Sequence, residues 1–139
     1  MSKTILVIDD DNLINALVAR LLGKEGYTVI TACNGPAGIE QYETMKPDLV
    51  VLDIAMPEMS GFEVAKAIRA IQRRDDRPHT PIILLTAYAR SFFIPTGSEA
   101  GIDSYLTKPI TPDQLISHVN RFLADQTRSS SGDTQPPHS

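Results

Sequence analysis

The sequence predicts an α/β fold in which a five-stranded parallel sheet carries helices on both faces. Short apolar runs rich in β-branched residues alternate along the chain with longer segments whose apolar residues recur at helical spacing. The short runs mostly lack polar alternation, which is typical of strands covered on both faces. Because strands and helices alternate, we expect a parallel sheet with right-handed crossovers.

Five apolar runs are the expected strands. For five strands in a doubly wound sheet the usual order is 2-1-3-4-5, the flavodoxin-like order, and ligands bind beyond the carboxyl ends of strands 1 and 3. The runs are Ile5–Ile8, Thr28–Ala32, Leu49–Leu52, Ile82–Thr86 and Ser104–Thr107.

Four of the segments between or after these runs carry an apolar stripe at helical spacing. Gly26 ends the first and Pro47 ends the second, whereas Thr111 caps the last and Pro112 is its first residue. The stripes comprise Leu13, Ile14, Leu17, Val18, Leu21 and Leu22; Ile39, Tyr42 and Met45; Phe62, Ala65, Ile68 and Ile71; and Leu115, Ile116, Val119, Phe122 and Leu123.

Length and composition indicate one domain with a tail. The chain has 139 residues, of which 42% are hydrophobic, and a net charge of −4. This mildly acidic balance gives no electrostatic reason to bind nucleic acid or an anionic membrane. We expect one domain over residues 1–125. The segment 126–139 has no large apolar residue, so we expect a disordered tail or linker.

The chain shows no sign of export or membrane insertion. Its single cysteine, Cys33, excludes an intramolecular disulfide and fits a reducing cytoplasm. No apolar run approaches the roughly 18 residues of a membrane span, and the N-terminus lacks the layout of a signal peptide. The stretch from Ile68 to Pro81 is rich in charges of both signs and is expected to be a solvated connection.

Acidic residues follow two strands that the fold places side by side. Asp9 and Asp10 follow the first strand, and Asp53 closes the third. Two carboxylates ~4 Å apart repel by about 4 kcal/mol at an effective dielectric near 20. A shared proton or a bound hard cation should relieve this repulsion. Such oxygens suit Mg²⁺. An Asp before a helix is often only a cap, a role that suits Asp11 and Asn12, but capping does not explain Asp53.

A hydroxyl and an ammonium reach the same edge of the sheet. Thr86 ends the fourth strand and Lys108 follows the fifth. Taken singly, Thr86 is explained by β-propensity and Lys108 by ordinary solvation of a loop lysine. Together with the acids they make a receptor for a phosphoryl group, in which a carboxylate can act as the nucleophile.

With these motifs the chain resembles the response-regulator receiver domain of two-component signalling, over about residues 3–125. The resemblance is carried by the acidic pair after "ILVI" and by "LDIAMPEMSG", "LLTA" and "AGIDSYLTKP", in matching order and spacing. It implies a Mg²⁺-dependent phosphoacceptor that takes its phosphoryl group from a histidine kinase or a histidine phosphotransfer protein. It also implies slow autodephosphorylation and signalling to an output protein, without classical enzyme activity.

The resemblance assigns a role to each matching residue. Asp53 matches the phosphoacceptor, Lys108 the phosphate-binding lysine, Thr86 the switch hydroxyl, and Tyr105 the aromatic ring that swings inward. The matching Mg²⁺ ligands are Asp10, Asp53 and the backbone carbonyl of Ala55, with Asp9 acting through water. A cis Lys108–Pro109 bond is likewise implied.

Two positions depart from the residues that promote hydrolysis in the family. Ala55 and Tyr88 lie where side chains flank the phosphoryl group, and neither offers an acid or amide to position water. They predict relatively slow autodephosphorylation. Ser60 stands where Asp is more usual before Gly61, and the turn can still form.

The segment "FFIPTG" at residues 92–97 interrupts the expected fourth helix. Pro95 and Gly97 disfavour a helix interior, so this helix should be short, displaced or partly unwound. Phe92, Phe93 and Ile94 either pack on the sheet or form an apolar output surface for a partner or a homodimer.

Other functions remain open at this stage. A dehalogenase-type phosphatase also uses an Asp after strand 1, but wants Asp-x-Asp followed by an apolar residue. A flavodoxin would need a phosphate loop where this chain has acids. A receiver that is never phosphorylated could act as an interaction module. The chain could be a stand-alone regulator, a phosphorelay shuttle or a piece of a longer protein.

Overall fold

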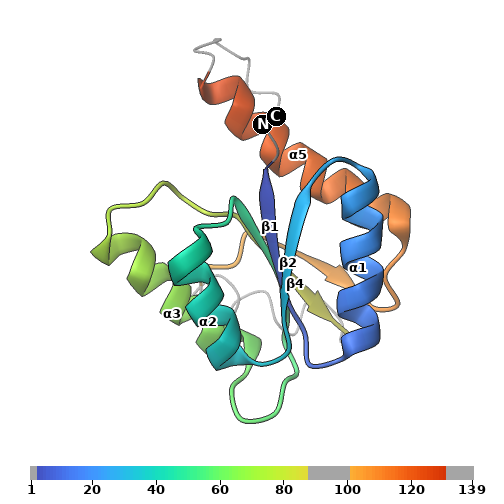
Figure 1. The fold of residues 1–139 in the computed structure, drawn as a ribbon, viewed down its shortest axis with the longest axis horizontal. Coiled ribbons are helices and arrows are strands. Elements are labelled where there is room, and N and C mark those ends of the chain that lie inside the picture. The colour runs from blue at the N-terminus through green and yellow to red at the C-terminus, as the bar shows by residue number, and fades with distance from the viewer. Residues whose placement is uncertain (1–2, 88–100, 131–139) are drawn as a thin grey trace.

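The computed structural model describes residues 3–87 and 101–130 and contains the expected parallel sheet (Figure 1). Its order is β2-β1-β3-β4-β5, as predicted. Each observed strand agrees with a predicted run to within one residue at either end. The strands are β1 (Thr4–Ile8), β2 (Thr28–Ala32), β3 (Leu49–Asp53), β4 (Ile82–Thr86) and β5 (Ser104–Thr107).

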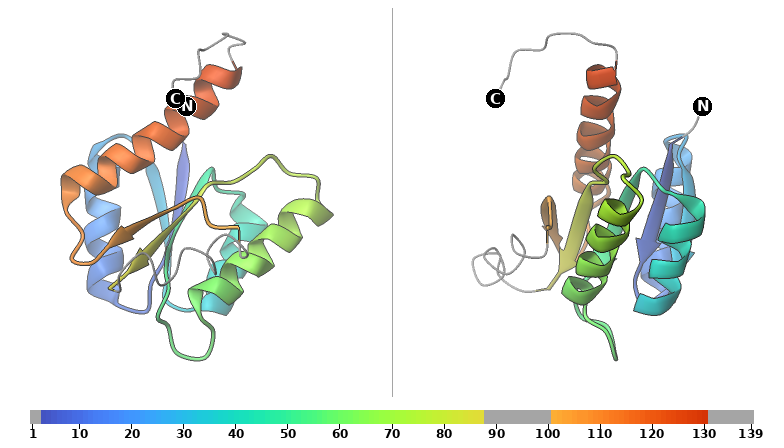
Figure 2. Two further views of the ribbon diagram at one scale, coloured as in Figure 1. Left: turned by 180° about the vertical axis from the view of Figure 1, so that it is seen from behind. Right: turned by 90° about the vertical axis from the view of Figure 1, so that its left-hand side faces the viewer.

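Helices cover both faces of the sheet, as the unbroken apolar strands require (Figure 1). The described helices are α1 (Asn12–Lys24), α2 (Gly35–Met45), α3 (Gly61–Arg74) and α5 (Pro112–Ser130). Figure 2 shows α2 and α3 on one side of the sheet and α1 and α5 on the other. Alternate strand residues therefore contribute to two separate cores, with Leu6 and Val50 facing α2 and α3, and Val7 and Val51 facing α1 and α5.

Local capping explains where the helices begin. Asp11 is the N-cap of α1, as predicted, and its side chain accepts a hydrogen bond from the backbone N–H of Leu13. Ser60 and Glu63 form a reciprocal capping box at the start of α3, so Ser60 serves as the N-cap of this helix. Gly61 is needed there, because a Cβ atom would lie 2.4 Å from the backbone oxygen of Asp53.

Three predicted core residues are exposed instead. Leu13 is 79% exposed, Leu17 41% and Met45 51%. The buried residues of α1 are Asn15, Val18 and Leu22. The predicted stripe of α1 was too wide, since a helix lying on a sheet buries only the arc that faces the strands, and Leu13 and Leu17 lie at its margin.

The charged stretch from Ile68 to Pro81 was predicted to be a solvated connection, and this is wrong for its first half, whereas residues 75–79 do form a largely exposed connection. It continues α3 as far as Arg74, and the Arg69 side chain is buried. Arg69 donates hydrogen bonds to the carbonyl oxygens of Thr80 and Gly101 and pairs with Asp103 at 2.9 Å. The charges gave no sign of burial, because the acceptors come from distant parts of the chain.

The C-terminal helix extends past the predicted end of the domain. Helix α5 continues to Ser130, so the boundary expected at residue 125 falls inside it. No Pro or Gly interrupts the chain before Gly132, so nothing in the intervening residues stops a helix. The irregular fourth helix predicted around residues 92–97 lies outside the described residues. None of the described helices has the length and apolarity to cross a membrane.

Candidate functional site

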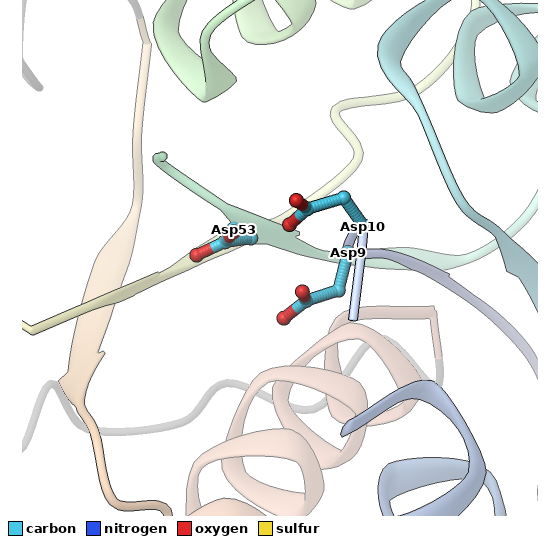
Figure 3. A group of neighbouring side chains, drawn as sticks. All are labelled: Asp9, Asp10 and Asp53. Carbon is cyan, nitrogen blue, oxygen red and sulfur yellow. The ribbon is translucent and has the colours of Figure 1, made fainter. Parts of the chain in front are cut away.

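The carboxyl ends of β1 and β3 bring three acidic side chains together. One carboxylate oxygen from each of Asp9, Asp10 and Asp53 lies within 4.8 Å of the others. Figure 3 shows the three carboxylates pointing to the same side, with Asp9 and Asp10 following β1 and Asp53 ending β3. These three residues, with Lys108 and Thr86, are called the acidic site below. Parallel strands cause this convergence, since their carboxyl ends share one edge.

Lys108 bridges two of the acids. Its ammonium Nζ lies 3.0 Å from Asp53 Oδ1 and 3.3 Å from Asp9 Oδ2. The peptide bond between Lys108 and Pro109 is cis, which confirms the geometry that the family resemblance implies. The backbone N–H of Lys108 donates to the Thr86 carbonyl oxygen at 2.8 Å, so the end of β4 holds the start of this loop.

Burial makes the two paired acids harder to ionise than usual. Desolvation raises the pKa of Asp9 and the pKa of Asp53, although hydrogen bonding and charge attraction from Lys108 oppose the shift. Burial also lowers the pKa of Lys108, but its hydrogen bonds and attraction to Asp53 and Asp9 outweigh that, and its pKa is raised overall. The ammonium is therefore charged at neutral pH, and it pairs with two of the three clustered carboxylates.

Asp9 and Asp10 differ sharply in their surroundings. Asp9 is fully buried, and its carboxylate also accepts a hydrogen bond from the Asp11 backbone N–H at 2.9 Å. Asp10 is exposed, and within the described part of the chain its carboxylate has no hydrogen-bond or ion-pair partner. Asp10 is thus the acid of the site that is most open to a ligand from solvent.

The remaining predicted residues surround the acids to different degrees. Thr86 ends β4 beside the loop of Lys108 and is 1% exposed. Tyr105 is half-buried and packs against the core beneath α2 and α3. Ala55 is exposed, two residues beyond Asp53. The remaining predictions, for Tyr88 and for the surface of Phe92, Phe93 and Ile94, lie outside the described residues.

Sequence reasoning missed one polar residue next to the acidic site. Asn15 in α1 is 6% exposed, and its amide Nδ2 donates to the backbone oxygen of Asp9 at 2.8 Å. The available signal was its spacing, because Asn15 lies three residues before Val18 and seven before Leu22 on the buried stripe. A polar residue on an apolar stripe indicates a buried hydrogen bond.

The donor set fits a hard divalent cation. Carboxylate oxygens clustered within 4.8 Å, one of them exposed, suit Mg²⁺, which prefers oxygen ligands and keeps several waters. Desolvation is the main cause of the raised pKa values of Asp9 and Asp53, and repulsion among the acids is a smaller one; a bound cation would favour the ionised form of both.

Comparison with known proteins identifies the class that this fold and site define. The family profile of the response regulator receiver domain matches residues 5–120. The chain therefore belongs to the response regulator receiver domain family of two-component systems, whose members are signalling proteins rather than classical enzymes.

Individual relatives agree with this assignment. The chain is 41% identical over 123 residues to the alkaline phosphatase synthesis transcriptional regulatory protein PhoP of Bacillus subtilis, covering 88% of this chain and 49% of the relative. It is 31% identical over 122 residues to the chemotaxis protein CheY of Thermotoga maritima, covering 87% of this chain and 98% of the relative.

A solved receiver domain has the same fold. The CheY-like receiver domain protein from Methanospirillum hungatei superposes with a TM-score of 0.82 at 29% identity, covering 93% of this chain and 99% of that one. The chain spans about half the length of several transcriptional regulators that it matches.

Proposed function

We propose that this chain is a phosphoacceptor that is modified on Asp53 in a Mg²⁺-dependent reaction. The observation that carries the proposal is the position of the Lys108 ammonium, 3.0 Å from an Asp53 oxygen beside two further acids. A lysine held there can bind the oxygens of a phosphoryl group that arrives at Asp53. Family membership supports the same assignment.

The three acids have different roles in the proposed reaction. Asp10, Asp53 and the backbone carbonyl of Ala55 would hold Mg²⁺, with Asp9 acting through a bound water. When bound, the cation neutralises charge on the acids and on the phosphoryl oxygens. Asp9 cannot serve equally well as nucleophile, because its two carboxylate oxygens already accept from Asp11 and Lys108.

The reaction is transfer of a phosphoryl group to a carboxylate oxygen. An Asp53 oxygen attacks phosphorus, the bond between phosphorus and the donor breaks, and the donor leaves with the bonding electron pair. A phosphohistidine in a histidine kinase or a histidine phosphotransfer protein is the donor class. Lys108 and the Thr86 hydroxyl bind the transferred oxygens, so the negative charge added to Asp53 remains compensated.

The added charge would act as a switch. Thr86 is drawn toward the phosphoryl group, and Tyr105, which is half-buried in the neighbouring strand β5, moves into the vacated space. The population of two surface conformations then shifts and an output protein reads it. Phe92, Phe93 and Ile94 are the proposed output surface, in a chain that acts in the cytoplasm as a monomer or a homodimer.

The phosphorylated form should be long-lived. Ala55 and Tyr88 bring neither acid nor amide to position an attacking water at the aspartyl phosphate. Decay followed after removal of the phosphodonor is expected to be slow compared with that of receivers carrying such groups. A lifetime of seconds would contradict this expectation.

Intact-mass analysis after incubation with acetyl phosphate and Mg²⁺ tests the proposed function. The wild-type chain should gain one phosphoryl group and release acetate, and Asp53→Asn should gain none. Asp113→Asn, an exposed acid in the first turn of α5, is the matched control and should be modified as the wild type is. An unmodified wild-type chain would favour an interaction module that works without phosphorylation. Phosphotransfer from a panel of histidine kinases would then identify the partner.

A further inference from the structure

Asn15 occupies an unusual position beneath the acidic site. It lies in the first turns of α1, is 6% exposed, and uses its Nδ2 group twice. One hydrogen bond goes to the backbone oxygen of Asp9 at 2.8 Å, and the other goes to the backbone oxygen of Ala32 at 3.2 Å. Asn15 thereby joins the loop after β1 to the end of β2.

With Asn15 in place, every polar atom of Asp9 has a partner. Its backbone N–H donates to Ala32 O at 3.1 Å, and its carboxylate accepts from the Asp11 N–H and from Lys108. Its backbone oxygen accepts from Asn15. Asp9 is consequently held in one orientation by contacts to three different parts of the fold.

The backbone oxygen of Asp9 also determines how Asp10 is presented. This oxygen belongs to the peptide unit that joins Asp9 to Asp10, and that unit is planar. A hydrogen bond that fixes the oxygen therefore fixes the plane from which Asp10 projects. The Asp10 carboxylate has no partner among the described residues, so its placement depends on this backbone.

The arrangement carries a cost that packing alone does not explain. Oδ1 of Asn15 is buried and lacks a hydrogen-bond partner within the described part of the chain. A leucine, which has the same number and branching of side-chain heavy atoms, would occupy this position between α1 and the sheet without leaving a buried acceptor unpaired. The amide offsets this cost with the two hydrogen bonds that Nδ2 donates to the backbone oxygens of Asp9 and Ala32.

We propose that Asn15 is a positioning residue for the Mg²⁺ site, holding the Asp9–Asp10 peptide so that both carboxylates face the cation. The inference rests on the proposed function, since it assumes that the acidic site binds Mg²⁺. Residues that orient metal ligands from behind commonly change metal affinity when they are replaced.

Titration calorimetry with Mg²⁺ alone, on the unphosphorylated chain, tests this role. Asn15→Leu should weaken Mg²⁺ binding about tenfold, because it removes both donors and keeps the number and branching of the side-chain heavy atoms. The matched control is Val18→Ala, one turn further along the same buried stripe, which loosens packing without touching Asp9. It should bind Mg²⁺ within about twofold of the wild type, well below the usual effect of a ligand-orienting group.

Each result separates the two proposals. Unchanged affinity in Asn15→Leu, or an equal loss in Val18→Ala, would overturn the positioning role and leave the Mg²⁺ site standing. A wild-type chain that binds no Mg²⁺ would instead overturn the proposed function on which the inference depends. Circular dichroism first verifies folding, and Asn15→Ala replaces Asn15→Leu if the leucine variant does not fold.

Discussion

The two ends of the sheet carry polar clusters that differ in how completely their charges are paired. At the carboxyl ends, the ammonium of Lys108 pairs with Asp9 and Asp53, and Asp10 has no partner among the described residues. At the amino ends of β4 and β5, Arg69 makes five hydrogen bonds, one for each of its N–H groups. Asp103 there accepts from Arg69, His79 and the backbone N–H of Ile82.

This difference in pairing indicates that the Arg69 cluster stabilises the fold, whereas the acidic site can bind a ligand. A fully paired guanidinium joins α3 to the residues before β4 and before β5, and it has no capacity left for a ligand. The acidic site keeps uncompensated negative charge, which a cation and a phosphoryl group could use. The contrast predicts that substitutions at Arg69 lower stability, whereas neutralising an acid of the acidic site raises it.

The largest expected effect on stability is that of replacing Arg69, whose charge is fully paired. Arg69→Met should lower the free energy of unfolding by about 3 kcal/mol, because it removes the ion pair with Asp103 and leaves two backbone carbonyls without the donor that Arg69 supplies. Urea unfolding followed by circular dichroism measures this. Phosphorylation of the variant should persist at a temperature where it is folded. A loss below about 1 kcal/mol would show that the Arg69 cluster is not a main source of stability.

Neutralising the acidic site should have the opposite sign. In the absence of metal, Asp53→Asn should raise the free energy of unfolding at pH 7 by about 1–2 kcal/mol, an ordinary size for a single substitution. Desolvation raises the pKa of Asp53, so its ionised form is disfavoured in the folded state.

The pH dependence provides the check on this prediction. A carboxyl whose folded-state pKa lies above its unfolded value lowers stability once it ionises, and this penalty disappears as the pH falls through the raised pKa. The gain in stability from Asp53→Asn should therefore shrink as the pH falls from 7 toward 3.8, the ordinary pKa of an aspartate. Urea unfolding in EDTA at several pH values measures it, and an advantage independent of pH would contradict the argument.

A smaller effect is expected from the backbone of the loop that follows Asp53. Glu58 has a φ of 71°, whereas Gly101 beside Arg69 has a φ of 81° and is already glycine. Glu58→Gly should raise stability by about 0.5 kcal/mol, because relief of the left-handed strain slightly exceeds the added entropy of the unfolded chain. Thermal unfolding measures it. Lower stability would mean that the Glu58 side chain stabilises the loop.

The smallest effect is expected at an exposed arginine of α3. Arg74 pairs with Glu43 at 2.7 Å and with Asp75 at 2.8 Å, and its side chain is 57% exposed. Water screens both pairs, so Arg74→Met should leave the urea midpoint unchanged within error. It serves as the matched control for Arg69→Met on the same helix. If Arg74→Met lost as much stability as Arg69→Met, burial could not explain why Arg69 matters more.

Most of the fold and of the acidic site could be predicted, because both follow from local pattern and strand order. Apolar runs defined the strands, and the parallel order brought Asp9, Asp10 and Asp53 to one edge. The position of Lys108 follows from the same rule, since it comes directly after β5. Their proposed roles depend on the family resemblance and on the experiments described above.

The sequence by itself determined the strands and the Asp11 cap of α1, since these depend on hydrophobic period and on residues close together in the chain. The general rule for alternating strands and helices then predicted the strand order and, with it, the convergence of the acids. Only the tertiary structure decided which polar side chains are buried. Asn15 and Arg69 lie inside because their acceptors, Ala32 and Gly101 among them, come from elements far away in the sequence. Helical spacing places Asn15 on the buried stripe of α1, but it does not show which distant group a buried polar side chain will bond.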